Sequence, residues 1–242
     1  MALTMPSVVS VEDAIRHYRL SDLSMFRAGY QALIGSSLEG GRVLEVCCGH
    51  GDLSGWLATH YPDARVTAMD RSKEYVDSAR ARHGHLPNLD LIVGDVLELS
   101  RFEPGSFDVV VGQATMHHLA HDLERASLEF SRILKPGGRC VFIYEPLGHN
   151  PLFAAVRAIH ISMAGWPDEC NIFERQIRAF AANFARHEFQ PFNLFGYWAK
   201  ALPNISLSRK IGGLLARLDG AIFRVWPGTA KYAANFNVVY VR

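Results

Sequence analysis

Between residues 42 and 145 the chain alternates short apolar runs with segments that have a helical pattern. The apolar runs are rich in β-branched and aromatic residues, which predicts strands at 42–47, 65–69, 89–93, 107–111 and 139–144. Helices are expected after Gly51, at 72–82 behind a Ser72 cap, and at 119–134. Strands that alternate with helices predict an α/β fold with a doubly wound, Rossmann-like parallel sheet and helices on both faces.

The alternation ends after Glu145. Beyond it, the pattern predicts two amphipathic helices, a strand, a longer helix and a closing strand, at 150–165, 171–186, 192–197, 206–225 and 236–241. Ahead of the first strand, amphipathic helices are expected at 11–20 and 22–33. The first two of the later helices interrupt the strand–helix rhythm, so we expect a helical lid or insertion there.

Composition excludes several classes of protein. With 49% hydrophobic residues and a formal net charge of +1, the chain has material for a large core and no long basic surface for nucleic acid. The four cysteines form no C-x-x-C pair, which favours free thiols in a reducing compartment. No signal sequence and no run of about 18 apolar residues is present. We therefore expect a cytoplasmic protein with no membrane span and no metal site.

Charge and aromatic content divide the chain into two unlike parts. Residues 1–145 carry 14 Lys+Arg against 19 Asp+Glu, whereas residues 146–242 carry 11 against 5. The second part also holds 15 of the 26 aromatic residues. An aromatic, positively charged segment is suited to cover an apolar pocket.

The stretch from Val43 to Asp52 is the most informative, because a buried strand ends in an acid and then in a glycine turn that opens a helix. Gly49 and Gly51 let backbone N–H groups approach a ligand closely. The same spacing also comes near the dinucleotide fingerprint of oxidoreductases. Glu45 favours a different ligand, since a carboxylate there would repel a pyrophosphate but bind a cationic amino group. A strand-end acid bonded only to its own loop is the alternative.

Two more acids follow the next strands. Asp70 comes 19 residues after Gly51, the place where doubly wound folds present an acid to ribose hydroxyls. Gly94-Asp95-Val96 ends the third strand, where the carboxylate could accept an exocyclic amino hydrogen or serve as a turn residue.

Five ordered motifs extend over residues 40–145: the Val43–Gly51 loop, Asp70, Gly94-Asp95, Phe107–Val111 with Met116-His117-His118-Leu119, and Ile133-Leu134-Lys135-Pro136-Gly137-Gly138. In these motifs the chain resembles class I S-adenosylmethionine-dependent methyltransferases of the small type 11 or UbiE-like kind. The resemblance implies a seven-stranded sheet with an antiparallel last strand. It also implies one domain over 1–242, with N-terminal helices at 1–38, a cofactor-binding core at 40–145, a lid or acceptor region at 146–190 and closing elements at 191–242.

The resemblance also implies roles for individual residues. Glu45 with Gly49 and Gly51 would hold the methionine end of S-adenosylmethionine, and Asp70 the ribose. The adenine would lie against Asp95 and Val96, and Gln113 would face the methionine moiety or the methyl group.

Two positions depart from the family pattern. Cys47 stands where the family has the first glycine of its loop, and it would be strained if that position needed φ > 0. Arg71 replaces a residue that is often apolar beside the adenine. It could stack its guanidinium there or point to solvent.

Methyl transfer to a hydroxyl needs a base, and the candidates are His117, His118 and Glu145, with Tyr144 and His149 beside them. Of the two adjacent histidines, His117 is preferred as the base. A capping or packing role for either histidine is the alternative, because the pair recurs in this motif across very different substrates.

The acceptor is expected to be a hydrophobic small molecule, natural-product-like or lipid-like, methylated on oxygen. Five aromatic residues suggest an apolar pocket, although each could simply be core: Phe153, Trp166, Phe173, Phe180 and Phe184. The positive charge of the same region suits an anionic acceptor or peripheral contact with a membrane surface. Two other functions remain open, a non-methylating reaction such as cyclisation with bound S-adenosylmethionine and, more distantly, a nicotinamide-dependent oxidoreductase. The oligomeric state stays open.

Overall fold

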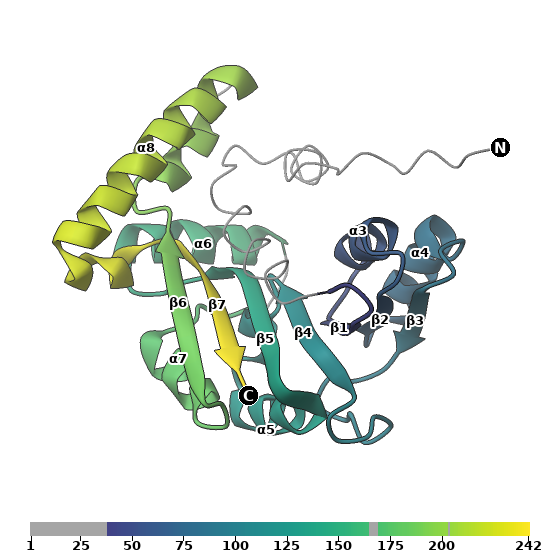
Figure 1. Cartoon of the computed structure of the whole chain (residues 1–242). Coiled ribbons are helices and arrows are strands. Elements are labelled where there is room, and N and C mark those ends of the chain that lie inside the picture. Colours follow the sequence, from purple (N-terminus) through teal and green to yellow (C-terminus); the bar gives the residue numbers. More distant parts are fainter. Residues whose placement is uncertain (1–37, 165–168, 203) are drawn as a thin grey trace.

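The computed structural model describes residues 38–164, 169–202 and 204–242 (Figure 1). The helices expected at 11–20 and 22–33 lie outside these residues. Seven strands form one sheet in the order β3-β2-β1-β4-β5-β7-β6. They are β1 (Arg42–Val46), β2 (Arg65–Asp70), β3 (Leu89–Val93), β4 (Phe107–Gln113), β5 (Leu134–Pro146), β6 (Arg186–Phe192) and β7 (Asn235–Val241).

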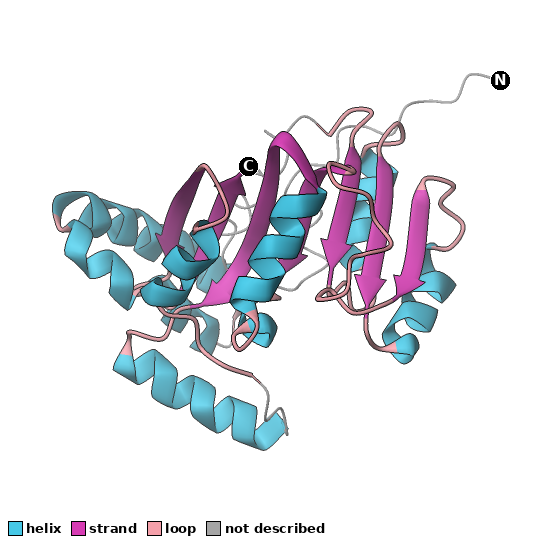
Figure 2. Ribbon diagram, turned by 90° about the horizontal axis from the view of Figure 1, so that it is seen from below, coloured by secondary structure: helices cyan, strands magenta, loops and turns pink. Residues whose placement is uncertain are grey.

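Strands β1 to β5 pair in parallel, whereas β7 runs antiparallel to both β5 and β6. The expected Rossmann-like sheet with an antiparallel last strand is therefore confirmed. Helices lie on both sides of it (Figure 2). They are α3 (Asp52–His60), α4 (Lys73–His83), α5 (Leu123–Ile133), α6 (Pro151–Ala164), α7 (Glu174–Ala181) and α8 (Ile205–Val225), with 3-10 turns η1 (Met116–Leu119), η2 (Gly196–Ala201) and η3 (Pro227–Tyr232).

The alternation of side chains along β4 shows how the sheet separates two cores. Val110 packs in one hydrophobic cluster, together with residues of α5 and α7. Its neighbours Val109 and Val111 pack in a second cluster with residues of α3. Successive side chains of a strand point to opposite faces, so a central strand buried on both faces is apolar without interruption.

The strand expected at 192–197 is wrong in its position. The strand is β6, which ends at Phe192, and residues 196–201 form the 3-10 turn η2. β6 is an edge strand with three exposed residues at its start and Pro191 near its end. An edge strand is solvated on one side, so it need not show an apolar run and it tolerates proline.

The lid expected at 146–190 is not confirmed. Its second helix, α7, lies in the core, where Phe180 is fully buried and Ile177 nearly so. The Tyr240 hydroxyl donates to the Ile177 carbonyl at 3.1 Å, and the Ser127 hydroxyl donates to the Phe180 carbonyl at 2.6 Å. These contacts pack α7 against the sheet as part of the core. In the first helix, α6, Phe153 is buried, whereas Leu152 and Ile159 are exposed.

Candidate functional site

A cavity of about 640 Å³ lies at the carboxyl ends of β1, β2 and β3. This is the edge where ligands bind in open α/β sheets. Six of the residues expected to hold the cofactor line it: Cys47, Gly49, Asp70, Arg71, Asp95 and Val96. Among the residues that sequence reasoning did not select, His50, Tyr75, Leu97, Leu119, His121 and Asp122 also line it.

Asp70 ends β2 and links the glycine loop to the start of α4. Its Oδ2 accepts the Gly49 N–H and its Oδ1 accepts the Ser72 N–H, each at 2.9 Å. A carboxylate oxygen has a second lone pair, so both oxygens can still accept a hydroxyl from the cavity. The Asp70 carboxylate can therefore position the loop and also accept hydrogen bonds from a diol.

The loop after β1 takes an unusual backbone conformation. Cys47, Gly49 and Gly51 have φ values of +52°, +52° and +74°. A Cβ at Gly51 would lie 2.9 Å from the Cβ of Ala79, so both conformation and space require glycine there. A Cβ at Gly49 would meet no atom within 4 Å, which leaves room beside the cavity.

Cys47 is strained in this loop, as expected for a position that needs φ > 0. A left-handed conformation costs about 1–2 kcal/mol for a residue with a Cβ. Burial raises the pKa of its thiol to about 12, with the Asp70 carboxylate acting in the same direction. The side chain is therefore a neutral thiol on the cavity wall and not a nucleophile.

Glu45 is buried at the end of β1 and is only 3% exposed. Burial raises the pKa of its carboxyl to about 8, against the opposing effect of the Ser54 hydroxyl and N–H. Among the described residues, no donor reaches its Oε2 atom. A buried carboxylate oxygen without a partner is costly, and a cationic group supplied by a ligand would satisfy it. Glu45 itself is not part of the cavity lining.

Of the remaining residues expected to bind the cofactor, Asp95, Val96 and Arg71 line the first cavity and Gln113 does not. Asp95 holds its own turn, since its Oδ1 accepts the Leu97 N–H at 2.9 Å, and it lines the cavity beside the buried Val96. Arg71 also lies on the wall. Gln113 ends β4 and lines neither cavity.

A second cavity of about 320 Å³ adjoins the first and shares Ala114 and His118 with it. Its other wall residues come from η1, β5, α6, η2, β7 and the segment before α7. They are His117, Tyr144, Pro146, Phe153, Arg157, Glu169, Tyr197 and Asn235. Sequence reasoning missed Arg157, although it is the one Lys, Arg, Asp or Glu residue in the apolar stretch 151–164.

Backbone strain is concentrated at these two cavities. Four non-glycine residues of the described chain have positive φ, namely Cys47, Ala114, Tyr144 and Asn193. The first three line the cavities. Strained conformations persist at functional sites because the surrounding structure holds them.

The expected base candidates lie in distinct surroundings. Glu145 is fully buried, and its two oxygens accept the N–H groups of Thr115, Met116 and His117 at 2.6, 2.8 and 3.2 Å. Its Oε2 also lies 2.8 Å from His117 Nδ1. These four contacts occupy the carboxylate, and they fix the start of η1 and the orientation of the imidazole.

Part of the His118 side chain is exposed and part is covered by protein, and the residue lines both cavities. Its ring lies 4.2 Å from that of His117, centroid to centroid. Partial burial, then the neighbouring His117, lower the pKa of His118 below its ordinary value. His118 is thus mainly neutral at pH 7 and able to accept a proton.

Arg157 and Glu169 form an ion pair on the wall of the second cavity, with Nη2 and Oε2 2.6 Å apart. The same Oε2 lies 3.9 Å from His117 Nε2. His117, His118 and Glu169 bring possible metal ligand atoms within 4.8 Å of one another. A metal cation could bind these three residues only if the ion pair between Glu169 and Arg157 were broken, because the guanidinium already neutralises that carboxylate.

The aromatic residues expected around an acceptor have mostly structural positions. Phe153 lines the second cavity, whereas Phe180 and Phe184 pack in the core. Phe173 packs against His149, whose Nε2 lies 3.4 Å from the Glu174 nitrogen. His149 lines neither cavity. Trp166 lies outside the described residues.

The part of the chain that forms the first cavity is similar to known methyltransferases. A family model described as a methyltransferase domain matches residues 43–138. A phthiotriol/phenolphthiotriol dimycocerosates methyltransferase of Mycobacterium tuberculosis is 36% identical over 142 residues, which is 59% of this chain and 49% of that protein. A demethylmenaquinone methyltransferase of Staphylococcus aureus is 32% identical over 123 residues, half of each chain. The chain spans half or less of the length of these curated relatives.

Solved structures agree on the fold. A phosphoethanolamine N-methyltransferase 2 of Haemonchus contortus, solved with S-adenosyl-L-methionine, matches with a TM-score of 0.62 at 20% identity. The match covers 97% of this chain and 60% of the other. The resemblance drawn from the five sequence motifs is confirmed.

Proposed function

We propose that this protein transfers a methyl group from S-adenosylmethionine to a hydrophobic small molecule and releases S-adenosylhomocysteine, since residues 43–138 match the family model of a methyltransferase domain. Two adjoining cavities that share Ala114 and His118 are the observation that carries the proposal. One has the chemistry of a nucleoside site, and the other has mixed aromatic and polar walls. Donor and acceptor would meet where the two cavities join.

The residues of the first cavity fit the cofactor. S-adenosylmethionine supplies a methyl group activated by a positively charged sulfur. Asp70 would accept the ribose hydroxyls, and Asp95 with Val96 would contact the adenine. The unpartnered Oε2 of Glu45 would accept the α-ammonium group. The ionised Glu45 carboxylate would repel a pyrophosphate, which disfavours a nicotinamide cofactor.

The second cavity fits an apolar acceptor. Tyr144, Phe153 and Tyr197 give it aromatic walls, and the Arg157–Glu169 pair gives it a polar end. The names of the relatives specify phthiotriol dimycocerosates and demethylmenaquinone as substrates. Both the wall chemistry and these names support a lipid-like acceptor with at least one polar group.

We assign oxygen methylation, with His118 as the base. His118 is the histidine at the junction of the cavities, and its lowered pKa keeps it ready to take a hydroxyl proton. His117 and Glu145 act as positioning residues, since Glu145 fixes the His117 ring beside that of His118. The remaining contribution is alignment and exclusion of water, as in other in-line displacements.

A turnover screen tests the proposal. The purified protein with S-adenosylmethionine would be offered matched apolar phenols, carboxylic acids and amines, and S-adenosylhomocysteine release would be followed. Release that depends on a phenol or alcohol, with the methyl group found on its oxygen by mass spectrometry, supports the proposal. Methyl transfer to the amine alone refutes oxygen methylation. Binding of S-adenosylhomocysteine without transfer to any acceptor favours a non-methylating reaction.

A further inference from the structure

A row of exposed apolar side chains runs along α8. Leu207, Leu214, Leu218 and Val225 are 47%, 66%, 47% and 65% exposed, and Trp226 at the end of the helix is 64% exposed. At about 100° per residue, the four aliphatic residues lie within about 40° of one another around the helix axis. They form a continuous stripe, which we call the apolar row.

A second row, of cations, runs beside it. Lys210, Arg217 and Arg224 recur at every seventh position and are all exposed. They lie about 80° around the helix from the apolar row. The one acid in the sequence of α8, Asp219, is 2% exposed and accepts the N–H groups of Phe195 and Gly196. No acidic side chain on the helix therefore offsets this cationic row.

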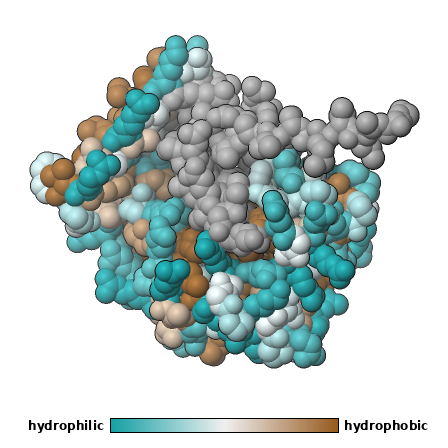
Figure 3. Space-filling view, viewed as in Figure 1, coloured by the Kyte–Doolittle hydropathy of each residue, from teal (hydrophilic) through white to brown (hydrophobic). Residues whose placement is uncertain are grey.

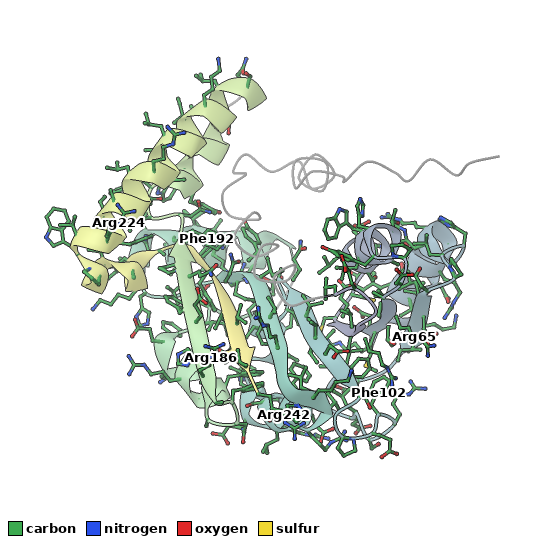
Figure 4. The ribbon with its side chains drawn as sticks, in the orientation of Figure 1. Arg65, Phe102, Arg186, Phe192, Arg224 and Arg242 are labelled. Atoms are coloured by element: carbon green, nitrogen blue, oxygen red, sulfur yellow. The ribbon has the colours of Figure 1, made fainter. Side chains whose placement is uncertain are left out.

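The opposite face of α8 packs against the protein. Ser208 and Asp219 are buried there, and the Ser208 hydroxyl donates to the Ala199 carbonyl of η2 at 2.8 Å. The helix projects from the side of the molecule away from β1–β3 (Figure 1). Figure 3 shows hydrophobic and hydrophilic side chains in parallel bands along it, and Figure 4 shows Arg224 on the same helix.

We propose that α8 docks this protein on an anionic lipid surface. An apolar stripe beside a cationic stripe, both directed away from the protein body, matches helices that lie in the membrane interface. Trp226 and Tyr232, exposed at the end of the helix and in η3, are the residue types that favour this depth. No helix among the described residues combines the length and apolarity needed to cross a bilayer.

The positive charge on α8 favours an anionic lipid surface over a second copy of the chain as the binding partner. A symmetric pairing through the apolar rows would bring two cationic rows close together, with no exposed acid on α8 to neutralise them. Anionic lipid headgroups supply that negative charge. Each Lys or Arg near such a surface contributes about 1 kcal/mol of binding, and salt weakens it.

Vesicle flotation tests docking independently of methyl transfer. The full chain would be floated with phosphatidylcholine vesicles and with vesicles that also contain phosphatidylglycerol, at low and high salt. We expect partitioning onto the anionic vesicles only, reduced by salt. Neutralising the cationic row with Lys210→Gln, Arg217→Gln and Arg224→Gln is expected to weaken it at least about tenfold. Leu214→Gln with Trp226→Gln is expected to weaken it to a similar degree.

Matched controls are an exposed leucine and an exposed arginine elsewhere. Leu128 on α5 is 58% exposed, and Arg65 begins β2 on the other side of the molecule (Figure 4). Leu128→Gln and Arg65→Gln should leave partitioning unchanged. All variants should keep the wild-type melting temperature and the affinity for S-adenosylhomocysteine. Absence of flotation at low salt overturns docking, as does flotation that the α8 variants do not alter. A dimer broken by Leu214→Gln, without vesicle binding, would assign the apolar row to self-association.

Discussion

The Nδ1 atom of His117 lies 2.8 Å from Oε2 of Glu145, and both side chains are buried. Because a carboxylate can only accept, Nδ1 of His117 donates to it, and Nε2 of the same ring lies 3.9 Å from Oε2 of Glu169, on the wall of the second cavity. The same carboxylate accepts three backbone N–H groups at the start of η1. One side chain from β5 thereby fixes the residues that follow β4.

Glu145→Gln is expected to destabilise the fold by about 2–3 kcal/mol. The amide keeps one acceptor oxygen and turns an NH2 group toward donors of η1, which leaves buried groups unpaired. Chemical denaturation of both proteins at pH 7 measures this difference. Equal midpoints and slopes would show that Glu145 does not hold η1.

His118→Ala is expected to lower kcat for a hydroxyl acceptor by about 10²-fold or more and to leave the affinity for S-adenosylhomocysteine unchanged. The reason is the position of His118 on the walls of both cavities. His117→Ala should lower kcat less, because His117 acts by positioning its neighbour. Steady-state kinetics beside calorimetry separate these effects. Full turnover by His118→Ala would exclude it as the base.

Cys47→Gly is expected to stabilise the protein by about 0.5–1 kcal/mol. Glycine removes the strain of a φ near +52°, and part of this gain is offset by its greater freedom in the unfolded chain. Cys47→Val, with a branched Cβ at the same φ, should destabilise it. Thermal melts of the three proteins give the order. A less stable Cys47→Gly variant would contradict the strain.

The central strands were predictable because they are buried on both faces. Val109, Val110 and Val111 must all be apolar, so the run in β4 stands out in the sequence. The edge strand β6 has no such requirement, and an aromatic segment next to it was taken for the strand. The length of α7 and its place in the core depend on contacts with Ser127 and Tyr240, which are distant in sequence.

The position of Asp70 and Asp95 on the wall of the first cavity was predictable from the order of the strands. Asp70 and Asp95 follow strands, and the topology alone brings strand ends to one edge. The second cavity depends on packing between separate elements. Arg157 and Glu169 meet across 12 residues, and Tyr197 approaches Phe153 edge-on at 4.9 Å between ring centroids. No local sequence pattern predicts these contacts.

Glu45 is expected to make the stability of the ligand-free protein depend on pH. Its folded pKa of about 8 exceeds the ordinary value of 4.5, so the folded state holds a proton that the unfolded state loses. The free energy of unfolding therefore falls as pH rises from about 4.5 to 8. Glu45→Gln removes this loss, and the ligand-free variant should melt higher than wild type at pH 8 but not at pH 5.

The same substitution should weaken S-adenosylhomocysteine binding, because the α-ammonium group loses its carboxylate partner. Melting curves over this pH range, with and without ligand, show both effects. An unchanged pH dependence in Glu45→Gln would mean that another group titrates. Unchanged ligand affinity would mean that Glu45 is structural only.

The most direct test of the cofactor assignment is calorimetry with S-adenosylhomocysteine and NAD on wild type and Asp70→Asn. Asp70 lines the first cavity, and the amide keeps its shape while losing the charge and one acceptor. We expect micromolar binding of S-adenosylhomocysteine, weakened by about 1–3 kcal/mol in a folded Asp70→Asn protein, and weaker binding of NAD throughout. NAD bound more tightly than S-adenosylhomocysteine, or an unchanged affinity in Asp70→Asn, would contradict the assignment of this cavity to S-adenosylmethionine.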